Sequence, residues 1–319
     1  MKEKNNPQKK SIKYVIIFLA LSFLISAIFN VYLFFGEQDY DIANRGNDKN
    51  QFNLLNPARN FFKQDDLIVN FQPLRYYLNK KYEADQNVSI YFEYLPTGSN
   101  VAISKDAEFY PASLLKVPVA MAVVKKIERG EWKWTNELVL MTADKDNRFG
   151  ALYKEPLNST HTIEDLVRRS LSESDNTAHF ILTRNLEISE IDDVYSHIGL
   201  QEFMETNGNL SAKRYSVIFR TLYNSSYLTE ENSQRLLSYL SQSSFDDYIK
   251  SGLSPDIVFA HKIGTDTERK VFLDSGIIYF SGRPYILTVM TKNETEEKAK
   301  IIMKYISGKV FDYVKNYKE

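Results

Sequence analysis

The feature that most restricts the fold is the order of strand-like and helix-like segments along the chain. Strand-like segments form a pair early in the folded region and a group of three near its end, at 88–94, 101–104, 257–262, 272–280 and 285–291. Between the two groups, from about 113 to 250, apolar residues recur with the spacing of helices. The pattern predicts an α/β fold of the α+β kind, with one five-stranded antiparallel sheet, flanking helices and an all-helical lobe.

Helical patterns also flank the strands. Apolar residues from Leu67 to Leu78 predict an amphipathic helix before the first strand, and a closing helix is expected at about 294–317. Inside the long helical region, Thr162 and Asp165 form a capping-box pattern. Two lobes packed together leave a cleft, which is a common place for a small-molecule site.

An uncharged run of 22 residues at 14–35 is long enough to cross a bilayer as a helix. Five lysines precede it and three acidic residues follow it, so the positive-inside rule places the N-terminus in the cytoplasm. The alternatives are a cleaved signal peptide, which has a shorter apolar region, and a buried core helix, which lacks a basic flank. We predict a single-pass cell-membrane protein with an extracytoplasmic domain, divided into a cytoplasmic tail, transmembrane anchor, spacer and folded domain at 1–13, 14–35, 36–66 and 67–319.

The composition excludes several kinds of function. A formal net charge of −1 gives no overall attraction to nucleic acid. The chain has no cysteine, which excludes a disulfide framework, thiol catalysis and cysteine-ligated zinc. Its four histidines show no paired ligand spacing, so we expect neither a metal nor an organic cofactor.

Ser113 and Lys116 have a spacing that suits nucleophilic catalysis. They open an apolar helix predicted at 114–128, and residues three apart lie on one helical face. A desolvated lysine can accept the proton of a serine hydroxyl, and backbone N–H groups at a helix start stabilise developing negative charge. Taken alone, the pair fits a helix-capping serine and a solvated lysine better.

Two further motifs follow. The sequence Ser-Asp-Asn at 174–176 lies inside the helical region, and Lys-Ile-Gly-Thr at 262–265 is expected to end the strand that begins near 257. A glycine there lets a substrate lie close against the strand edge. Each motif is weak in isolation, and the order of the three is the informative observation.

This order of S-x-x-K, S-D-N and Lys-x-Gly resembles the signature of class A β-lactamases and penicillin-binding proteins. The resemblance extends to FYPASLLKVPVAMAVVKKIERGEW, to TIEDLVRRSLSESDNTAHFIL, and to HKIGT with the later VFLDSGIIYFSGRPYILTVMT. It covers about residues 67–317. The chain is thereby identified as a member of this family of serine hydrolases, and the two-lobed fold of the family is expected.

The resemblance implies four catalytic residues. Ser113 would form the acyl-enzyme, with Lys116 as its proton acceptor or part of that relay. Ser174 would pass a proton to the leaving nitrogen. Lys262 would hold Ser174 and the substrate carboxylate electrostatically.

The resemblance also implies how the substrate binds. Asn176 would bind the side-chain amide of the substrate, and Gly264 and Thr265 of the late strand would also contact the substrate. Backbone N–H groups of Ser113 and Thr265 would form the oxyanion hole. Asp175 is expected to be structural.

Two positions depart from the family pattern. Ile263 stands where the family has a hydroxyl residue that bonds the substrate carboxylate, so the carboxylate would depend on Lys262 and Thr265. The loop that carries the deacylating glutamate is about a dozen residues short between 200 and 211. Glu205 keeps the motif's spacing, but a solvated surface glutamate is the better interpretation.

Three functions remain open. The first is a β-lactamase with full turnover. The second is a peptidase or transpeptidase that acts on peptidoglycan stem peptides and releases β-lactams slowly. The third is a non-catalytic cell-wall-binding module with a degenerate site. The complete set of motif residues disfavours the module, and the short loop disfavours rapid turnover. We expect a monomeric catalytic domain.

Overall fold

The computed structural model describes residues 68, 70–201, 203 and 208–317, and in the N-terminal region only Ser22, Phe23 and Ser26. The chain divides into the units Met1–Gln51 and Phe52–Glu319, and the fold below is that of the second. Among the described residues, no helix combines the length and hydropathy needed to span a bilayer. Apart from the three N-terminal residues named above, the predicted anchor and spacer lie outside the described residues, as does Glu205.

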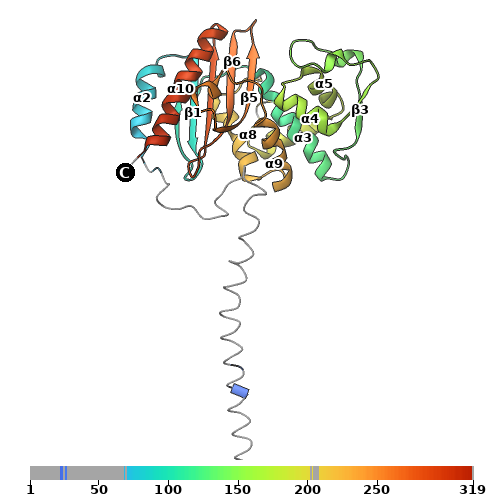
Figure 1. Ribbon diagram of the computed structural model, residues 1–319, viewed down its shortest axis with the longest axis horizontal. Coiled ribbons are helices and arrows are strands. Elements are labelled where there is room, and N and C mark those ends of the chain that lie inside the picture. Colours follow the sequence, from blue (N-terminus) through green and yellow to red (C-terminus); the bar gives the residue numbers. More distant parts are fainter. Residues whose placement is uncertain are drawn as a thin grey trace, which may run out of the picture. The chain divides into compact units, whose positions relative to one another are not determined.

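A five-stranded antiparallel sheet forms the centre of the folded unit (Figure 1). Its strands are β1 (Val88–Tyr94), β2 (Ser99–Ile103), β5 (Val258–Asp266), β6 (Val271–Tyr279) and β7 (Tyr285–Lys292). They pair in the order β2-β1-β7-β6-β5, so the early hairpin lies beside the last strand. This confirms the predicted five-stranded sheet.

Both faces of the sheet are covered. All of β1 is buried, and successive side chains of a strand point to opposite faces. Ile90 and Phe92 therefore join one core, whereas Tyr91 joins another. Glu93 is also buried and accepts a hydrogen bond from Nε of Arg220 at 2.7 Å, which compensates its loss of water.

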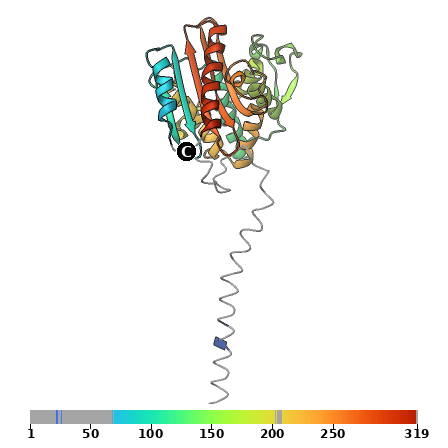
Figure 2. The ribbon, with the colours of Figure 1, turned by 60° about the vertical axis from the view of Figure 1, so that its left-hand side comes forward.

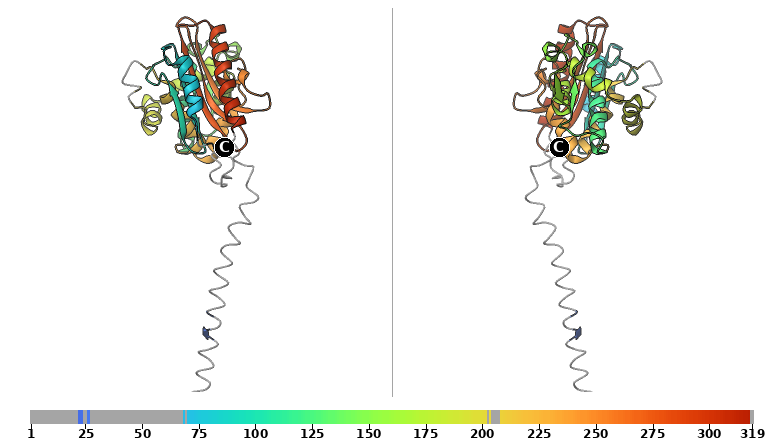
Figure 3. Two further views of the ribbon diagram at one scale, coloured as in Figure 1. Left: turned by 90° about the vertical axis from the view of Figure 1, so that its left-hand side faces the viewer. Right: turned by 90° about the vertical axis from the view of Figure 1, so that its right-hand side faces the viewer.

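Two helices cover one face of the sheet, α2 (Gln72–Tyr82) and α10 (Glu296–Asn316). In Figure 2 and the left panel of Figure 3 they lie side by side across the strands. Leu74, Leu78 and Tyr82 recur one turn apart on α2 and pack into the core beneath. Both helices were expected from the apolar spacing. α2 begins at Gln72, later than the apolar pattern that starts at Leu67, and a proline in its first turn fits this start.

The long insert forms the second lobe, and α8 and α9 of this lobe pack against the sheet. Its helices are α3 (Lys116–Glu128), α4 (Ile163–Ser172), α5 (Asn176–Arg184), α6 (Ile188–His197), α8 (Ala212–Asn224) and α9 (Glu230–Leu240). Thr162 caps α4 as predicted, because its hydroxyl accepts the Asp165 N–H at 3.2 Å.

The prediction of an all-helical lobe is wrong in one respect. Two short strands, β3 (Glu137–Val139) and β4 (Thr160–Thr162), pair antiparallel within the lobe. Strands of three residues are too short to produce a recognisable alternation of apolar and polar residues.

The motif at 262–265 lies at the end of β5, as predicted. β5 runs to Asp266, past the apolar pattern at 257–262, and pairs with β6 over its whole length. A Cβ atom on Gly264 would lie 2.6 Å from the carbonyl oxygen of Pro111, closer than such atoms pack. The glycine therefore lets β5 lie directly against the turn that precedes α3.

Candidate active site

Ser113 lies in a 3-10 turn, η3 (Ala112–Leu115), that leads directly into α3. Lys116 is the first residue of α3, so both side chains project from the same turn of the chain. The Nζ atom of Lys116 lies 3.0 Å from Oγ of Ser113. Only 2% of Lys116 is exposed, which means that its amine has lost nearly all of its water.

The amine of Lys116 also contacts the Ser-Asp-Asn segment. Nζ lies 2.6 Å from the carbonyl oxygen of Ser174, 3.1 Å from its Oγ, and 2.6 Å from Oδ1 of Asn176. A neutral amine at this position can donate its two protons to the two carbonyl-type oxygens and accept the proton of a hydroxyl such as that of Ser113.

The charge state of Lys116 follows from its burial. Burial lowers the pKa of Lys116 to about 7, while the carboxylates of Asp175 and Asp146 oppose the shift and Arg148 adds to it. An ordinary lysine has a pKa of about 10.4. Near neutral pH a substantial fraction of Lys116 is therefore neutral and able to accept a proton.

Lys262 approaches the same group of atoms from β5. Its Nζ lies 2.7 Å from Oγ of Ser174. Burial, and then the positive charge of Lys116, lower the pKa of Lys262 well below its usual range, while Asp274 opposes the shift. The hydroxyl of Ser174 thus lies between two lysine amines. A continuous path of polar atoms joins Ser113 to Lys262.

The structure brings Asn176 into this network through both ends of its amide. Oδ1 faces Lys116, and Nδ2 donates to Oδ1 of Asp146 at 2.9 Å. Asp146 is itself held by Arg148, whose guanidinium lies 2.6 Å from Oδ2. Sequence reasoning missed Asp146, because no motif includes it and its partner lies 30 positions further on.

Asp175 has the structural role expected of it. Its Oδ1 accepts the N–H of Ala178, which caps α5, and its Oδ2 accepts the N–H groups of Ala151 and Leu152. The carboxylate therefore ties the preceding loop to the start of α5. Gly150 makes the contact possible, because a Cβ at that position would overlap Asp175.

Two residues of the site have a left-handed backbone. Ala112 has φ of 47° and Ser174 has φ of 54°. Such values are uncommon outside glycine and cost of order 1–3 kcal/mol each. Ala112 precedes Ser113 in the chain, and Ser174 carries the hydroxyl that lies between the two lysine amines. The surrounding packing therefore holds both segments of the site in a conformation that they would not adopt alone.

A cavity of about 580 Å³ gives access to the site. Ser113, Lys116, Asn176 and Thr265 line it, whereas Ser174 and Lys262 are almost completely buried. The other charged and aromatic residues of its lining are Tyr110, Arg148, Phe149, His179, Phe180, Asp266 and Glu268. A small ligand in the cavity can therefore reach Ser113, whereas Ser174 and Lys262 lie behind the lining.

Of the late motif at 262–265, only Thr265 lines this cavity. Ile263 packs in the core on the α10 side of the sheet, because neighbouring residues of a strand face opposite sides and Lys262 faces the lobe. Gly264 contacts the Pro111 turn instead. The structure therefore places Lys262 and Thr265, but not Ile263, at the site.

His179 is a second cavity residue that no motif includes. Its Nδ1 atom is buried and has no hydrogen-bond partner among the described residues. Burial, with the positive charges of Lys116 and Lys262, lowers the pKa of His179 to about 3. The imidazole is consequently neutral. Its position three residues after Asn176, on the same helical face, was the available sequence signal.

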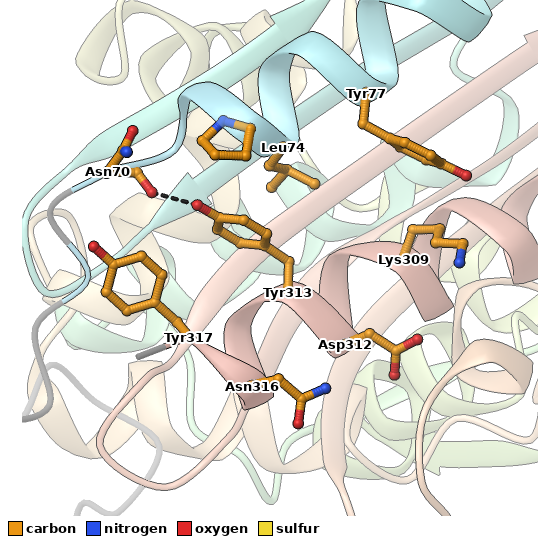
Figure 4. A pocket seen from close by; sticks show the side chains of 9 residues that line it. Asn70, Leu74, Tyr77, Lys309, Asp312, Tyr313, Asn316 and Tyr317 are labelled. Atoms are coloured by element: carbon orange, nitrogen blue, oxygen red, sulfur yellow. Dashed lines mark hydrogen bonds between the residues drawn. The ribbon is translucent and has the colours of Figure 1, made fainter. Parts of the chain in front are cut away.

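A larger cavity of about 780 Å³ lies between α2 and α10 (Figure 4). Tyr77, Tyr313 and Tyr317 line it, and the Tyr313 hydroxyl donates to the backbone oxygen of Asn70. None of its described lining residues belongs to the three motifs. It contains no nucleophile with an adjacent base, so we assign the chemistry to the smaller cavity.

Over the described part of the chain, no group of three or more histidine, aspartate or glutamate side chains is arranged to hold a metal ion. Ser113 and Lys116 contact amine, hydroxyl, amide and backbone carbonyl groups. A buried amine next to two hydroxyls suits proton transfer.

The sequence profile of the Beta-lactamase enzyme family matches residues 73–314. The chain is also similar to Beta-lactamase VEB-1 from Pseudomonas aeruginosa. The two are 25% identical over 232 residues, which cover 64% of this chain and 77% of that protein.

The solved structures of similar fold include PBP-A and several β-lactamases. PBP-A gives a TM-score of 0.70 at 19% identity, over 77% of this chain and 97% of PBP-A. A β-lactamase from Sphaerobacter thermophilus gives 0.69 at 21% identity, over 79% of this chain and 100% of that one. A mutant of PBP-A has been solved as an acyl-enzyme complex with penicillin G, and its TM-score is 0.67 at 19% identity over 77% of this chain and 96% of that one.

Proposed function

Because the chain belongs to the beta-lactamase enzyme family, we propose that it is a serine hydrolase in which Ser113 forms an acyl-enzyme. Its substrates would be β-lactams or D-alanyl peptides of the cell wall. The observation that carries this proposal is the 3.0 Å approach of the buried Lys116 amine to the Ser113 hydroxyl. Such a pair supplies a nucleophile and its base in one turn of the chain.

Acylation would use the network in sequence. The neutral amine of Lys116 takes the Ser113 proton while Oγ attacks the carbonyl carbon of the amide. Backbone N–H groups of Ser113 and Thr265 stabilise the negative charge on the carbonyl oxygen. When the carbon–nitrogen bond breaks, the Ser174 hydroxyl gives a proton to the leaving nitrogen and regains one from a neighbouring amine.

Substrate binding would divide between polar groups of the cavity. Asn176 has a donor that can meet the side-chain amide of the substrate. Lys262 lies behind Ser174, and an incoming carboxylate would favour its protonated form. Since Ile263 faces the core, the carboxylate would depend on Lys262 and Thr265. This arrangement supports a substrate with both an amide and a carboxylate.

Two relatives support this class of substrate. VEB-1 is a β-lactamase, and the PBP-A mutant forms an acyl-enzyme with penicillin G. Both chemistries begin with the same acylation step and differ in how fast water removes the acyl group. The proposal therefore commits to acylation of Ser113 and treats turnover separately.

We further propose that deacylation is slow. Deacylation needs a base that activates water, and the chain is about a dozen residues short where the family carries its glutamate. Of the two glutamates in that stretch, Glu202 and Glu205, only Glu205 keeps the spacing of the family's motif. A cell-wall peptidase that retains β-lactams for minutes or longer fits this composition better than a rapid β-lactamase does.

A time course with fluorescent penicillin tests the proposal. Labelling that persists after excess penicillin is removed supports a slow penicillin-binding enzyme. Rapid labelling followed by rapid loss would indicate a β-lactamase, which keeps the acyl-enzyme but contradicts slow deacylation. Absence of labelling would overturn the proposal and favour a cell-wall-binding module.

We also propose that the domain lies outside the cell, held by the apolar run at 14–35. The run is uncharged, of membrane-spanning length and preceded by lysines. Protease added to intact cells should remove the domain and leave a short protected N-terminal fragment. A soluble mature protein that starts near Gly36 would contradict the anchor.

A further inference from the structure

Asp146 contacts the active-site network although it belongs to none of the three motifs. Its Oδ1 accepts a hydrogen bond from Nδ2 of Asn176 at 2.9 Å. The other end of the same amide, Oδ1, accepts from Lys116 at 2.6 Å. The three side chains form a line that runs from a carboxylate, through an amide, to the amine beside Ser113.

The position of Asp146 is fixed from two sides. The backbone N–H of Asp146 donates to Oγ1 of Thr177 at 3.0 Å, and the Thr177 hydroxyl donates to the backbone oxygen of Asp146 at 3.2 Å. Thr177 follows Asn176 in α5, so the loop and the helix are held in register. On the far side, the Arg148 guanidinium contacts Oδ2 at 2.6 Å and its backbone N–H contacts Oδ1 at 3.0 Å.

The carboxylate determines which way the Asn176 amide points. An amide has an acceptor end and a donor end, and an ionised carboxylate only accepts. The pKa of Asp146 is lowered to about 2, mainly by the side-chain hydrogen bond from Arg148, so the group is ionised at neutral pH. A reversed amide would set its oxygen against the Asp146 carboxylate, where neither group has a proton to donate. The hydrogen bond to Asp146 would be lost, and Lys116 would lose the amide oxygen to which it donates.

Building on the function proposed above, we propose that Asp146 is a positioning residue for acylation. It holds the Asn176 amide with Oδ1 toward Lys116, which keeps the lysine amine beside Ser113. The second proton on Nδ2 then remains for the amide carbonyl of the substrate. Asp146 acts through Asn176 and touches neither Ser113 nor the reacting bond.

The proposal has an electrostatic consequence. The charged or titratable groups near Lys116 are Asp146, Asp175, Arg148, Lys262 and His179. The carboxylate of Asp146 raises the pKa of Lys116 and the guanidinium of Arg148 lowers it. Because acylation uses the neutral amine, its rate rises as pH passes through the Lys116 pKa. Removal of the Asp146 charge moves this rise to lower pH, and removal of the Arg148 charge moves it to higher pH.

The test is the pH dependence of acylation of the full-length chain by fluorescent penicillin, from about pH 5 to about pH 9. Asp146→Asn keeps an acceptor oxygen but loses the charge, so its high-pH rate should stay within about threefold of wild type while the rise moves to lower pH. Asp146→Ala loses both, and its high-pH rate should fall roughly tenfold to hundredfold. Arg148→Gln should move the rise in the opposite direction.

A double-variant cycle shows whether Asp146 acts through Asn176. In an Asn176→Ala background, Asp146→Ala should cause little further loss of the high-pH rate. Loss of the same size in both backgrounds would overturn the positioning role. So would pH profiles of Asp146→Asn and Arg148→Gln that coincide with wild type. A residue that only supports the loop would give both of these results.

Two controls keep the outcomes distinct. Thermal unfolding of each variant identifies any that fail to fold. Arg148→Gln tests the effect of charge on the Lys116 pKa at a side chain that is 70% exposed, so it changes no buried contact. Wild-type protein that is never labelled would overturn the proposed function and the positioning role together. Labelled wild type with unshifted variants would overturn the positioning role alone.

Discussion

The Nζ atom of Lys116 lies 3.0 Å from Oγ of Ser113, at the point where a 3-10 turn becomes α3. The lysine is buried on a helix that is apolar over most of its length. A base of this kind is active only when neutral. The pair therefore connects the packing of one helix with the pH at which the enzyme works.

Lys116→Arg should abolish most acylation although it keeps a positive charge, because arginine does not lose its proton in proteins. Removal of a general base typically costs about 10²–10⁴-fold. In wild type, the acylation rate should rise with pH through about 7, the pKa to which burial lowers Lys116. Stopped-flow measurement with a chromogenic β-lactam gives both results. A wild-type acylation rate for Lys116→Arg would show that the side chain at position 116 acts only through its charge.

Gly264→Ala should destabilise the protein by about 1–3 kcal/mol, because the new Cβ would lie 2.6 Å from the carbonyl oxygen of Pro111. It should also slow acylation, since that turn carries Ser113. Gly308→Ala is the matched control. Its Cβ would meet only ordinary contact at 3.6 Å in α10, where alanine is favoured by about 0.5–1 kcal/mol. Equal urea midpoints for the two variants would refute the close approach.

Asp175→Asn should lower the free energy of unfolding by about 2–4 kcal/mol, because one amide oxygen cannot replace two carboxylate oxygens that accept three backbone N–H groups. Asp165→Asn, at an ion pair of α4 whose side chains are 35% and 29% exposed, should cost less than about 1 kcal/mol. Urea unfolding measures both. If the two substitutions cost the same, the carboxylate of Asp175 does not hold the loop onto α5.

Glu205→Gln should leave the lifetime of a penicillin adduct nearly unchanged, since we interpret this residue as a solvated glutamate. Intact-protein mass spectrometry over minutes to hours follows the adduct. The contrary result is an adduct trapped in Glu205→Gln that wild type clears rapidly. Glu205 would then be the deacylating base, and the protein a working β-lactamase.

Much of the fold could be predicted from local patterns. Two groups of strands separated by a helical insert predict one sheet built from the early and late parts of the folded region. The three-residue spacing of Ser113 and Lys116 places them on one helix face. The direction of Ile263 was also available, because a strand that turns Lys262 toward the lobe turns its neighbour toward the opposite core.

Other features depend on contacts between distant segments. Asp146 meets Asn176 only because its loop folds back onto the start of α5, and no periodicity records that contact. The extension of β5 to Asp266 depends on pairing with β6 rather than on its own residues. The short strands β3 and β4 likewise form only because each pairs with the other.

The most direct test of the central claim is the mass and position of a penicillin G adduct on the full-length chain. Opening of a β-lactam ring by Ser113 adds the whole mass of the drug, since no group leaves. Peptide mapping should place this mass on Ser113, and Ser113→Ala should carry none. An equal adduct on Ser113→Ala, or an unmodified wild type that also fails to hydrolyse penicillin G, would contradict the account.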